Sequence, residues 1–426
     1  MSRFVVRGGN ALQGSFTPTG NKNAALPMLA ACLLTDQEVT LRRVPDIADV
    51  QVMCDLLRTL GVSVVRNGDV VRLRASEVNP DGLSPEFCKQ IRGSILLAGP
   101  LLARCGRVQL APPGGDVIGR RRLDAHVHGL QEMGAGLKFT SKGMELTCNE
   151  LKPADLLLDE ASVTASENLI MAAAATPGIN VIYNAACEPH VQDVCRLVEA
   201  MGAEVTGIGT NRLVIKGSKN LGGADVELGA DYIEAASYLA AAAVTGGSIR
   251  VCNVHVPSIY RVLHRSFNRL GAGWEVDGRD WVYKAREKLQ VGDDLGGAIP
   301  KIEDGIWPAT PSDMMSLLLV VATKAEGSVL FFEKMFESRM VWTDRLISMG
   351  ARIVQCDPHR VLVNGPCQLT GSLQTSPDIR AGMALILAAL SAEGESVIEN
   401  AQMIDRGYQQ MDLRLRELGA NIERSE

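Results

Sequence analysis

Stretches of almost uninterrupted apolar residues occur six times along the chain, and each is followed by a short run that favours a strand. The apolar stretches are Ala24–Leu34, Ser94–Cys105, Asn168–Ala175, Ile233–Val244, Met314–Thr323 and Ala381–Leu390. The runs that follow them are Val39–Val44, Arg107–Ala111, Asn180–Asn184, Ser248–Val254, Ser328–Phe332 and Ser396–Asn400. Apolar stretches of this kind predict helices that are buried on every side.

A second signal is a [Leu/Met]-Gly-[Ala/Val] triplet. Each copy follows an amphipathic run such as Val194–Met201 or Met411–Leu418, where glycine is a natural end for a helix. A strand–turn–strand pattern follows each of the first five copies, as in Ser63–Val65 with Val70–Leu73. One repeat therefore reads strand, apolar helix, strand, amphipathic helix, strand, strand. The triplets are Leu60-Gly61-Val62, Met133-Gly134-Ala135, Met201-Gly202-Ala203, Leu270-Gly271-Ala272, Met349-Gly350-Ala351 and Leu418-Gly419-Ala420.

A single repeat cannot bury an all-apolar helix, so several repeats must assemble. We expect the apolar helices to point at a shared axis, with the sheets outside. Six helices are many for one axis, which favours two groups of three repeats. The length of 426 residues also indicates two or more domains.

Composition excludes several functional classes. The net charge of −6 gives no reason to expect nucleic acid or an anionic membrane as partner. The ten cysteines include no CxxC pair, so no zinc site is indicated, and most read as small core residues in a reducing cytoplasm. The start of the chain, MSRFVVRGGN, contains no apolar signal region, and no apolar run is long enough for a membrane span. We therefore expect a cytoplasmic protein.

The segment Pro112–Asp124 combines a flexible backbone with charge. It holds three glycines, the carboxylate of Asp116 and the guanidinium groups of Arg120–Arg122. A mobile loop with an acid beside cations suits a phosphorylated, anionic substrate. Taken alone, such a loop is more often a solvated surface turn, because glycine-rich loops are common.

Polar and charged residues occupy equivalent places in successive repeats. If the two groups of repeats face each other, these places line one cleft, where helix N-termini suit phosphate groups. Just before the apolar helices stand Asn21-Lys22-Asn23, Arg92, Ser162, Asp231, Asp313, and Asp378 with Arg380. Between the second strand and the amphipathic helix stand Asp116 with Arg121, Glu188, Glu337 with Arg339, and Asp405 with Arg406.

Several separate blocks of sequence, in order, resemble one family. They are Gly20-Asn21-Lys22-Asn23-Ala24-Ala25-Leu26-Pro27, Pro113-Gly114-Gly115-Asp116-Val117-Ile118-Gly119, Trp307-Pro308 through Pro311-Ser312-Asp313, and Asp405-Arg406-Gly407-Tyr408. From about Phe4 to the C-terminus the chain is similar to the UDP-N-acetylglucosamine 1-carboxyvinyltransferases, which are enolpyruvyl transferases. The resemblance implies an α/β fold of two inside-out α/β barrels (α/β prisms), each made of three βαβαββ repeats.

The implied domains are residues 22–230, with the mobile loop 112–124, and residues 1–21 plus 231–426. The chain would cross between them near Gly20-Asn21 and Gly229-Ala230, with the active-site cleft between the domains. The first strand, Phe4–Arg7, would complete the last repeat.

The implied reaction transfers the enolpyruvyl group of phosphoenolpyruvate to the 3-hydroxyl of UDP-N-acetylglucosamine and releases phosphate. It is the first committed step of peptidoglycan synthesis. No metal or organic cofactor is implied, and we expect a monomer or a weak homo-oligomer. Two alternatives stay open: an enolpyruvyl transferase for another acceptor (shikimate 3-phosphate or a uridine nucleotide), or a non-catalytic sugar-nucleotide-binding paralogue.

The resemblance also implies roles for single residues, with Asp116 as general acid and Asp313 as the group that accepts the hydroxyl proton. The positions implied for catalysis are Lys22, Asp116, Asp313, Asp378 and Arg406. Those implied for phosphoenolpyruvate are Lys22, Asn23, Arg121 and Arg406. Those implied for UDP-N-acetylglucosamine are Asn23, Arg92, Arg121, Arg122, Leu123, Asp124, Ala125, Ser162, Val163, Thr164, Asp313 and Met335.

Some of these residues also have a structural interpretation. Asp313 could cap the helix Met314–Thr323, and Asp405 could cap a helix or orient an arginine. Glu337 and Arg339 fit a structural salt bridge as well as a direct role. We expect His126 to be a structural hydrogen-bonding residue.

Asp116 departs from the resemblance, because cysteine is common at its position. A carboxyl ordinarily has a pKa of about 4, against about 8.5 for a thiol, so a carboxyl acid must be shielded from water by the closed loop. Aspartate is a far weaker nucleophile than cysteine, which predicts resistance to the epoxide fosfomycin. Arg122 (where proline is common) and Thr164 (where glycine is common) also depart, on the nucleotide side.

Overall fold

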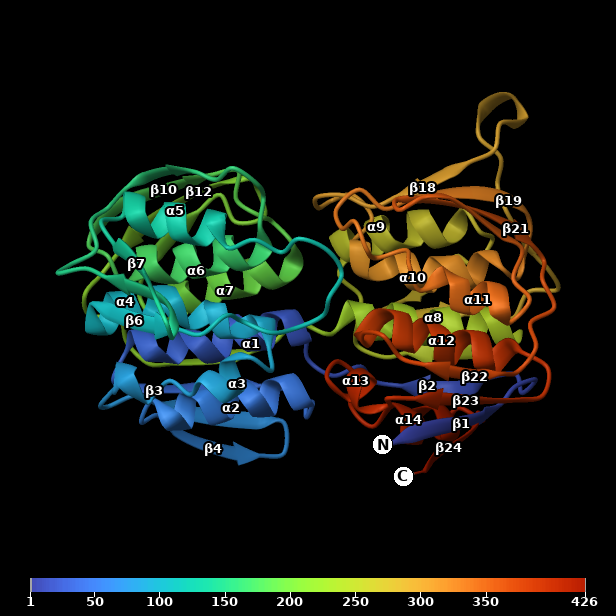
Figure 1. Ribbon diagram of the computed structural model, residues 1–426, viewed down its shortest axis with the longest axis horizontal. Coiled ribbons are helices and arrows are strands. Elements are labelled where there is room, and N and C mark those ends of the chain that lie inside the picture. The colour runs from blue at the N-terminus through green and yellow to red at the C-terminus, as the bar shows by residue number, and fades with distance from the viewer. Residues whose placement is uncertain (1, 426) are drawn as a thin grey trace. The chain divides into compact units, whose positions relative to one another are not determined.

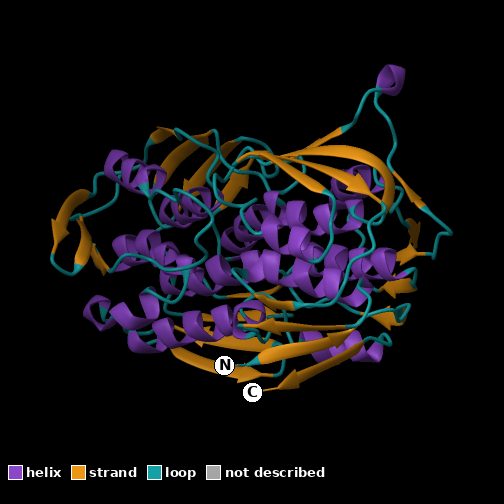
Figure 2. Ribbon diagram, turned by 45° about the vertical axis from the view of Figure 1, so that its right-hand side comes forward, coloured by secondary structure: helices purple, strands orange, loops and turns teal. Residues whose placement is uncertain are grey.

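In the computed structural model, which describes residues 2–425, the chain forms two compact units. Unit 1 contains Met1–Thr19, Val117–Arg120 and Ala230–Glu426, and unit 2 contains Gly20–Asp116 and Arg121–Gly229. Both are α/β structures that combine several sheets with helices (Figures 1 and 2). Among the described residues, no helix combines the length and apolar character that a membrane crossing requires.

Unit 2 has three sheets, of strand order β13-β3-β5-β4, β6-β8-β7 and β11-β12-β10-β9. The first and third are mixed: β13 is parallel to β3 and β9 to β10, whereas the other pairs are antiparallel. The strands are β3 (Glu38–Arg42), β4 (Ser63–Asn67), β5 (Val70–Arg74), β6 (Arg107–Leu110), β7 (Gly136–Thr140), β8 (Gly143–Thr147), β9 (Asp155–Leu157), β10 (Gly178–Tyr183), β11 (Glu204–Thr206), β12 (Arg212–Gly217) and β13 (Ala224–Glu227).

Unit 1 has three sheets as well, and all three are mixed. Their strand orders are β22-β23-β1-β24, β15-β16-β14-β2 and β17-β19-β21-β20, with β18 paired to β19 in addition. The strands are β1 (Arg3–Arg7), β2 (Gln13–Phe16), β14 (Ser248–Val251), β15 (Glu275–Asp277), β16 (Asp280–Tyr283), β17 (Leu289–Gln290), β18 (Lys301–Glu303), β19 (Ala325–Phe332), β20 (Ile353–Asp357), β21 (Arg360–Gly365), β22 (Leu373–Thr375), β23 (Glu395–Glu399) and β24 (Asn421–Ser425).

The helices of unit 2 are α1 (Lys22–Ala30), η1 (Ala31–Leu34), α2 (Ala48–Thr59), η2 (Pro80–Gly82), α3 (Pro85–Cys88), η3 (Arg92–Leu97), α4 (Ala98–Cys105), α5 (Asp124–Glu132), α6 (Val163–Ala174) and α7 (Pro189–Ala200). Those of unit 1 are α8 (Tyr232–Thr245), α9 (Pro257–Asn268), η4 (Leu295–Gly297), α10 (Ser312–Ala322), α11 (Thr343–Ser348), α12 (Ile379–Ser391), α13 (Gln402–Asp405) and α14 (Met411–Glu417).

Three apolar helices pack together in each unit, as the sequence predicts. In unit 1, α8, α10 and α12 contact one another, and in α10 every residue except Asp313 is buried. In unit 2, α1, η3 with α4, and α6 form the equivalent set. Each fully buried Leu, Val or Met side chain contributes about 1.5 to 3 kcal/mol, so these helices hold each unit together.

The chain order and the sheet order differ at two places. Strand β2 precedes α1 in the chain but pairs with β14, which follows α8. Strand β13 precedes α8 but pairs with β3, which follows α1. The prediction that the first strand completes the last repeat is confirmed, because β1 pairs with both β23 and β24.

The second repeat lacks its predicted first strand. Its place is taken by η2, α3 and η3, and β6 pairs with β8 alone among the described strands. Pro80 and Pro85 begin η2 and α3, and neither has the N–H that a sheet ladder needs. Pro100 likewise cannot donate to Leu96, so the predicted helix Ser94–Cys105 divides into η3 and α4.

The glycine of every predicted triplet has a positive φ, from 71° at Gly271 to 109° at Gly202. An L-residue in this region costs about 1 to 2 kcal/mol, which is why glycine ends each of these helices.

We therefore expect Gly202→Ala to lower the free energy of unfolding by about 1 to 2 kcal/mol, because the strain comes from the backbone alone. A Cβ at this position has no atom within 4 Å to clash with. Gly222→Ala is the control, since its φ is not positive and its nearest neighbour would lie at 3.7 Å. Urea unfolding of both variants checks the prediction, and equal losses would contradict it.

Candidate active site

Polar residues cap the buried helices. Asn21 Oδ1 accepts hydrogen bonds from Asn23 N at 2.8 Å and Ala24 N at 3.2 Å at the start of α1. Asp378 Oδ1 does the same for Arg380 N at 2.8 Å and Ala381 N at 2.9 Å at the start of α12. Ser162 and Asp231 cap α6 and α8 in the same way. The repeats thus place their polar groups at the N-terminal ends of apolar helices.

Asp313 is held between two buried arginines of unit 1. Its Oδ1 accepts from Arg339 Nη2 at 2.6 Å, and its Oδ2 lies 3.1 Å from Arg380 Nη2. The expectation that Asp313 caps the helix is wrong: Pro311 is the N-cap residue of α10, and Asp313 lies in the first turn. The two guanidinium groups fix the carboxylate in place.

The arginines are themselves anchored. Arg380 Nη1 donates to Tyr408 Oη at 3.3 Å, and Tyr408 Oη lies 2.9 Å from Ser237 Oγ. Burial lowers the pKa of Arg380, but the Asp313 carboxylate together with Tyr408 and Asp231 raises it by more, so the group stays charged. Burial likewise lowers the pKa of Arg339, and the carboxylates of Asp313, Glu333 and Asp378 together leave it raised.

Lys22 and Asp49 form a buried ion pair in unit 2, with Lys22 Nζ 2.8 Å from Asp49 Oδ2. Lys22 is the first residue of α1 and Asp49 lies in the first turn of α2. Asn23 follows Lys22 on α1 and is half-buried. Asp49 carries no signal of its own in the sequence, although a buried lysine requires a counter-charge.

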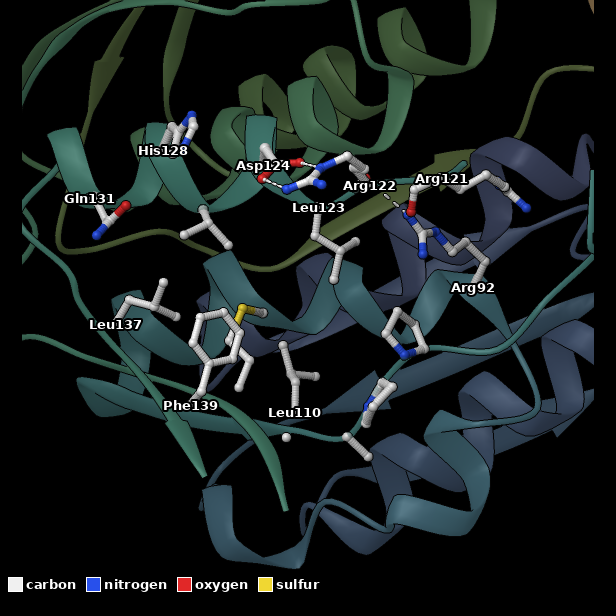
Figure 3. Close-up of a pocket in the computed structure, with 16 residues that line it drawn as sticks. Arg92, Leu110, Arg121, Arg122, Leu123, Asp124, His128, Gln131, Leu137 and Phe139 are labelled. Atoms are coloured by element: carbon white, nitrogen blue, oxygen red, sulfur yellow. Dashed lines mark hydrogen bonds and ion pairs between the residues drawn. The ribbon is translucent and has the colours of Figure 1, made fainter. Parts of the chain in front are cut away.

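Arg92 organises the segment that follows the glycine-rich loop. Its Nη2 donates to the carbonyl oxygens of Arg121 and of Arg122, the latter at 3.1 Å (Figure 3). Burial lowers the pKa of Arg92 to about 10, with a further contribution from the charge of Arg121. Arg122 donates to Asp124 Oδ1 at 2.8 Å, and this hydrogen bond lowers the pKa of Asp124 to about 2.

A pocket of about 630 Å³ lies beside this segment in unit 2. Leu110, Leu137 and Phe139 line it opposite Leu123, with Arg92 and Arg121 at one end (Figure 3). Its walls are mainly apolar and its charge is cationic at that end, which suits a ligand with a flat apolar part and an anionic part.

The tip of the loop, Val117–Arg120, belongs to unit 1. Ser338 N donates to Ile118 O at 3.1 Å, and Arg120 N donates to Glu337 Oε2 at 3.1 Å. The structural salt bridge between Glu337 and Arg339 is therefore wrong, because Arg339 pairs with Asp313 and Glu337 accepts from the backbone of the loop. Asp116 precedes this tip and is half-buried.

His126 is a structural residue, as predicted. Asn168 Oδ1 accepts from Gly99 N at 2.7 Å, so the amide nitrogen faces His126 Nδ1 at 3.0 Å. The other ring nitrogen, Nε2, then donates to Thr164 Oγ1 at 3.0 Å. This arrangement joins α5 to α6 and fixes the positions of Ala125, which is buried, and of Val163 and Thr164, which are half-buried.

The remaining predicted positions lie in unit 1. Met335 is 41% exposed, and Arg406 directly follows α13. Asp405 does not cap a helix; it accepts from Arg424 Nη1 at 2.9 Å and Nη2 at 2.6 Å. Ser312 contacts Arg339, and Tyr408 contacts Arg380, which are the two arginines that hold Asp313. Neither residue was predicted as a site residue.

Across residues 2–425, no three His, Cys, Asp or Glu side chains are grouped to hold a metal ion.

Comparison with solved structures defines the class of fold. The enolpyruvyl transferase NikO from Streptomyces tendae superposes with a TM-score of 0.87 at 22% identity, over 100% of this chain and 99% of that one. EPSP synthase from Acinetobacter baumannii superposes with a TM-score of 0.73 at 18% identity, over the whole of both chains. The fold is that of the enolpyruvyl transferases, and the family profile of EPSP synthase (3-phosphoshikimate 1-carboxyvinyltransferase) matches residues 6–415.

Sequence relatives narrow the class. The UDP-N-acetylglucosamine 1-carboxyvinyltransferase of Bradyrhizobium diazoefficiens is 49% identical over 99% of this chain and 98% of its own length. That of Borreliella burgdorferi is 47% identical over 100% and 99%. The chain belongs to the family of UDP-N-acetylglucosamine 1-carboxyvinyltransferases.

Burial lowers the pKa of His126 to about 3, against an ordinary 6.5. The unfolded chain therefore binds a proton at this residue below pH 6.5 while the folded chain does not, and stability is lost as pH falls from about 6.5 toward about 3. We expect His126→Gln to flatten this part of the curve of unfolding free energy against pH. The exposed His128→Gln is the control and should leave the slope as in wild type; an unchanged slope in His126→Gln would refute the assignment.

Proposed function

We propose that this chain transfers the enolpyruvyl group of phosphoenolpyruvate to the 3-hydroxyl of UDP-N-acetylglucosamine and releases phosphate, the first committed step of peptidoglycan synthesis. The observation that carries the proposal is the carboxylate of Asp313, fixed by Arg339 and Arg380 at the start of a buried helix. It stands in a chain that aligns over its whole length with enzymes of that name.

The chemistry is an addition followed by an elimination. Asp313 takes the proton of the 3-hydroxyl as the oxygen bonds to C2 of the enol, and Asp116 gives a proton to C3. Asp116, now a carboxylate, then takes a proton back from C3, the C2–O bond breaks with its electron pair leaving on phosphate, and the double bond between C2 and C3 re-forms. A carboxylate held by two guanidinium groups is pre-positioned for the first of these proton transfers.

Cations are proposed to bind the phosphorylated substrate. We assign Lys22, Arg121 and Arg406 to its phosphate and carboxylate, with Asn23 beside them and Asp378 near the reacting carbons. Arginine presents two parallel N–H groups to such anions, so lysine would be a poor replacement at 121 or 406.

The nucleotide is assigned to the Arg92-organised segment and to the start of α6. The carbonyl contacts of Arg92 shape the backbone of Arg121–Ala125, and the cap at Ser162 leaves backbone N–H groups of the first helical turn for a phosphate. Val163, Thr164, Asp313 and Met335 complete this assignment. The apolar pocket beside Leu123 supports it, because a uracil ring is a flat ligand with an anionic extension.

In fold terms we propose two inside-out α/β barrels of three repeats each, residues 22–230 and residues 1–21 with 231–426. Packing of α8 with α10 and α12 in unit 1, and of α1 with α4 and α6 through their 3₁₀ turns in unit 2, supports this description. Groups of both units are proposed to act on the same pair of substrates.

Phosphate release from phosphoenolpyruvate tests the function directly. We expect release to require UDP-N-acetylglucosamine and to be absent with shikimate 3-phosphate. Asp116→Ala should lower turnover by about 10² to 10⁴-fold, the usual contribution of a general acid, while both substrates still bind by calorimetry. Asp124→Ala is a control outside the proton transfers, and it should change KM more than kcat. Full activity of Asp116→Ala would refute the role of this residue, and release that needs shikimate 3-phosphate would refute the acceptor.

The aspartate also predicts a drug response. We expect fosfomycin, an epoxide, to leave the wild-type chain active and unmodified, because a carboxylate is a weaker nucleophile than a thiolate. Asp116→Cys should become sensitive and gain the mass of the inhibitor at position 116. Intact-mass and peptide mass spectrometry measure both proteins, and a covalent adduct on Asp116 of the wild type would overturn the prediction.

A further inference from the structure

Two buried carboxyl groups, those of Asp304 and Glu333, lie side by side near the residues that hold Asp313. Strands β18 and β19 are parallel, and Glu303 pairs with Phe332. The next residue of each chain segment, Asp304 after β18 and Glu333 after β19, therefore lies beside the other. Both have an exposed fraction of 0%. Lys334 N donates to Asp304 Oδ1 at 2.5 Å, whereas no group in residues 2–425 donates to Asp304 Oδ2.

One proton accounts for this arrangement. Two ionised carboxylates in contact inside a protein repel each other, so such a pair retains a proton between them. Burial, and then the hydrogen bond to Asp304, raises the pKa of Glu333 to about 9. The proton that the pair retains is the donor that Asp304 Oδ2 otherwise lacks, and the pair carries a single negative charge at neutral pH.

Ser312 connects this pair to the candidate base. Its hydroxyl donates to the Glu333 carboxyl, with Oε1 at 2.9 Å and Oε2 at 3.0 Å, and accepts from Arg339 Nε at 2.8 Å. The neighbouring Nη2 on the same edge of the guanidinium donates to Asp313 Oδ1 at 2.6 Å. Arg339 Nε lies 4.0 Å from Glu333 Oε2, which is close enough for charge attraction.

We propose that Asp304 and Glu333 share one proton and act as a positioning pair: their single charge, with the Ser312 hydroxyl, fixes Arg339, and Arg339 fixes the carboxylate of Asp313. The proposal rests on the proposed function in one respect, the role of Asp313 as base. The proton-sharing itself stands on the geometry of the pair.

Other charged groups around the pair are accounted for. His359 Nδ1 lies 2.7 Å from the backbone oxygen of Glu333, and Lys334 Nζ pairs with Glu303 Oε1 at 3.3 Å. Arg380 binds the second oxygen of Asp313, Oδ2. The charge of Asp378 helps to raise the pKa of Arg339. Loss of the shared proton would add a second negative charge beside Arg339 and draw it away from Asp313.

Amide substitutions test the single proton. In Asp304→Asn the amide nitrogen can replace the proton toward Glu333, and in Glu333→Gln it can do so toward Asp304, so each variant keeps one negative charge. We expect each to lower kcat by no more than about threefold. The double variant has no charge at the pair, and we expect its kcat to fall about 10- to 100-fold with little change in KM, the range of a lost charged hydrogen bond. Ser312→Ala cuts the connection and should lose kcat similarly.

The pH profiles distinguish this role from simple packing. Wild-type kcat should fall above a pH of about 9, where the pair loses its proton. Asp304→Asn and Glu333→Gln lack that ionisation and should keep their activity there. Glu303→Gln, at the end of the same strand and 37% exposed on its side chain, is the matched control and should behave as wild type. A single variant that loses as much kcat as the double variant would overturn the proposal, and so would a double variant with wild-type kcat.

A second measurement is independent of the reaction. The folded chain holds the shared proton up to a pH of about 9, whereas Glu333 in the unfolded chain loses it near its ordinary 4.5. Wild-type stability should therefore fall as pH rises from about 4.5 to about 9, and both single variants should lose this slope. Thermal unfolding across that range measures it for all variants and also verifies that they fold. Equal slopes in wild type and single variants would refute the shared proton. This measurement does not depend on which sugar or other molecule accepts the enolpyruvyl group.

Discussion

The whole architecture depends on covering helices that have no polar face. A helix such as α10 or α12, buried along almost all of its length, gains about 1.5 to 3 kcal/mol for each large side chain, but only if protein surrounds it. A single sheet covers one side of a helix. Three helices packed together cover one another on the inside, and three sheets cover them on the outside. The repeat is the smallest segment that supplies one helix and one sheet to such an assembly.

This constraint also decides where polar chemistry can occur. Charged groups are excluded from the sides of the buried helices, so they collect at the helix ends, where the first backbone N–H groups need acceptors. Asn21, Ser162, Asp231 and Asp378 meet that need with their own side chains. The candidate site residues are the neighbours of these caps: Lys22 and Asn23 follow one, Arg380 follows another, and Thr164 follows a third.

Buried charge in unit 1 is tolerated because it is matched. Arg339 and Arg380 are almost fully buried, which would be costly for isolated cations, yet each lies against the carboxylate of Asp313. Ser312 and Tyr408 satisfy further guanidinium N–H groups. Such a group is rigid, since moving one member exposes the charge of another. Rigidity of this kind is what a proton-transfer site requires from its surroundings.

The sequence by itself determined the repeat, its helices and most of its strands, because apolar periodicity and helix-ending glycines are local signals that survive without knowledge of the fold. It also identified Lys22, Asp313 and Arg380 as candidates, because their motifs are local too. Only the tertiary structure decided which charges meet. The partner of Arg339 is Asp313, not the nearby Glu337, and Asp304 meets Glu333 across a parallel strand pair. The absence of the predicted first strand in the second repeat is likewise a feature that only the tertiary structure decided. Pairings between segments far apart in the chain follow from how sheets close around helices, and no short stretch of residues carries that information.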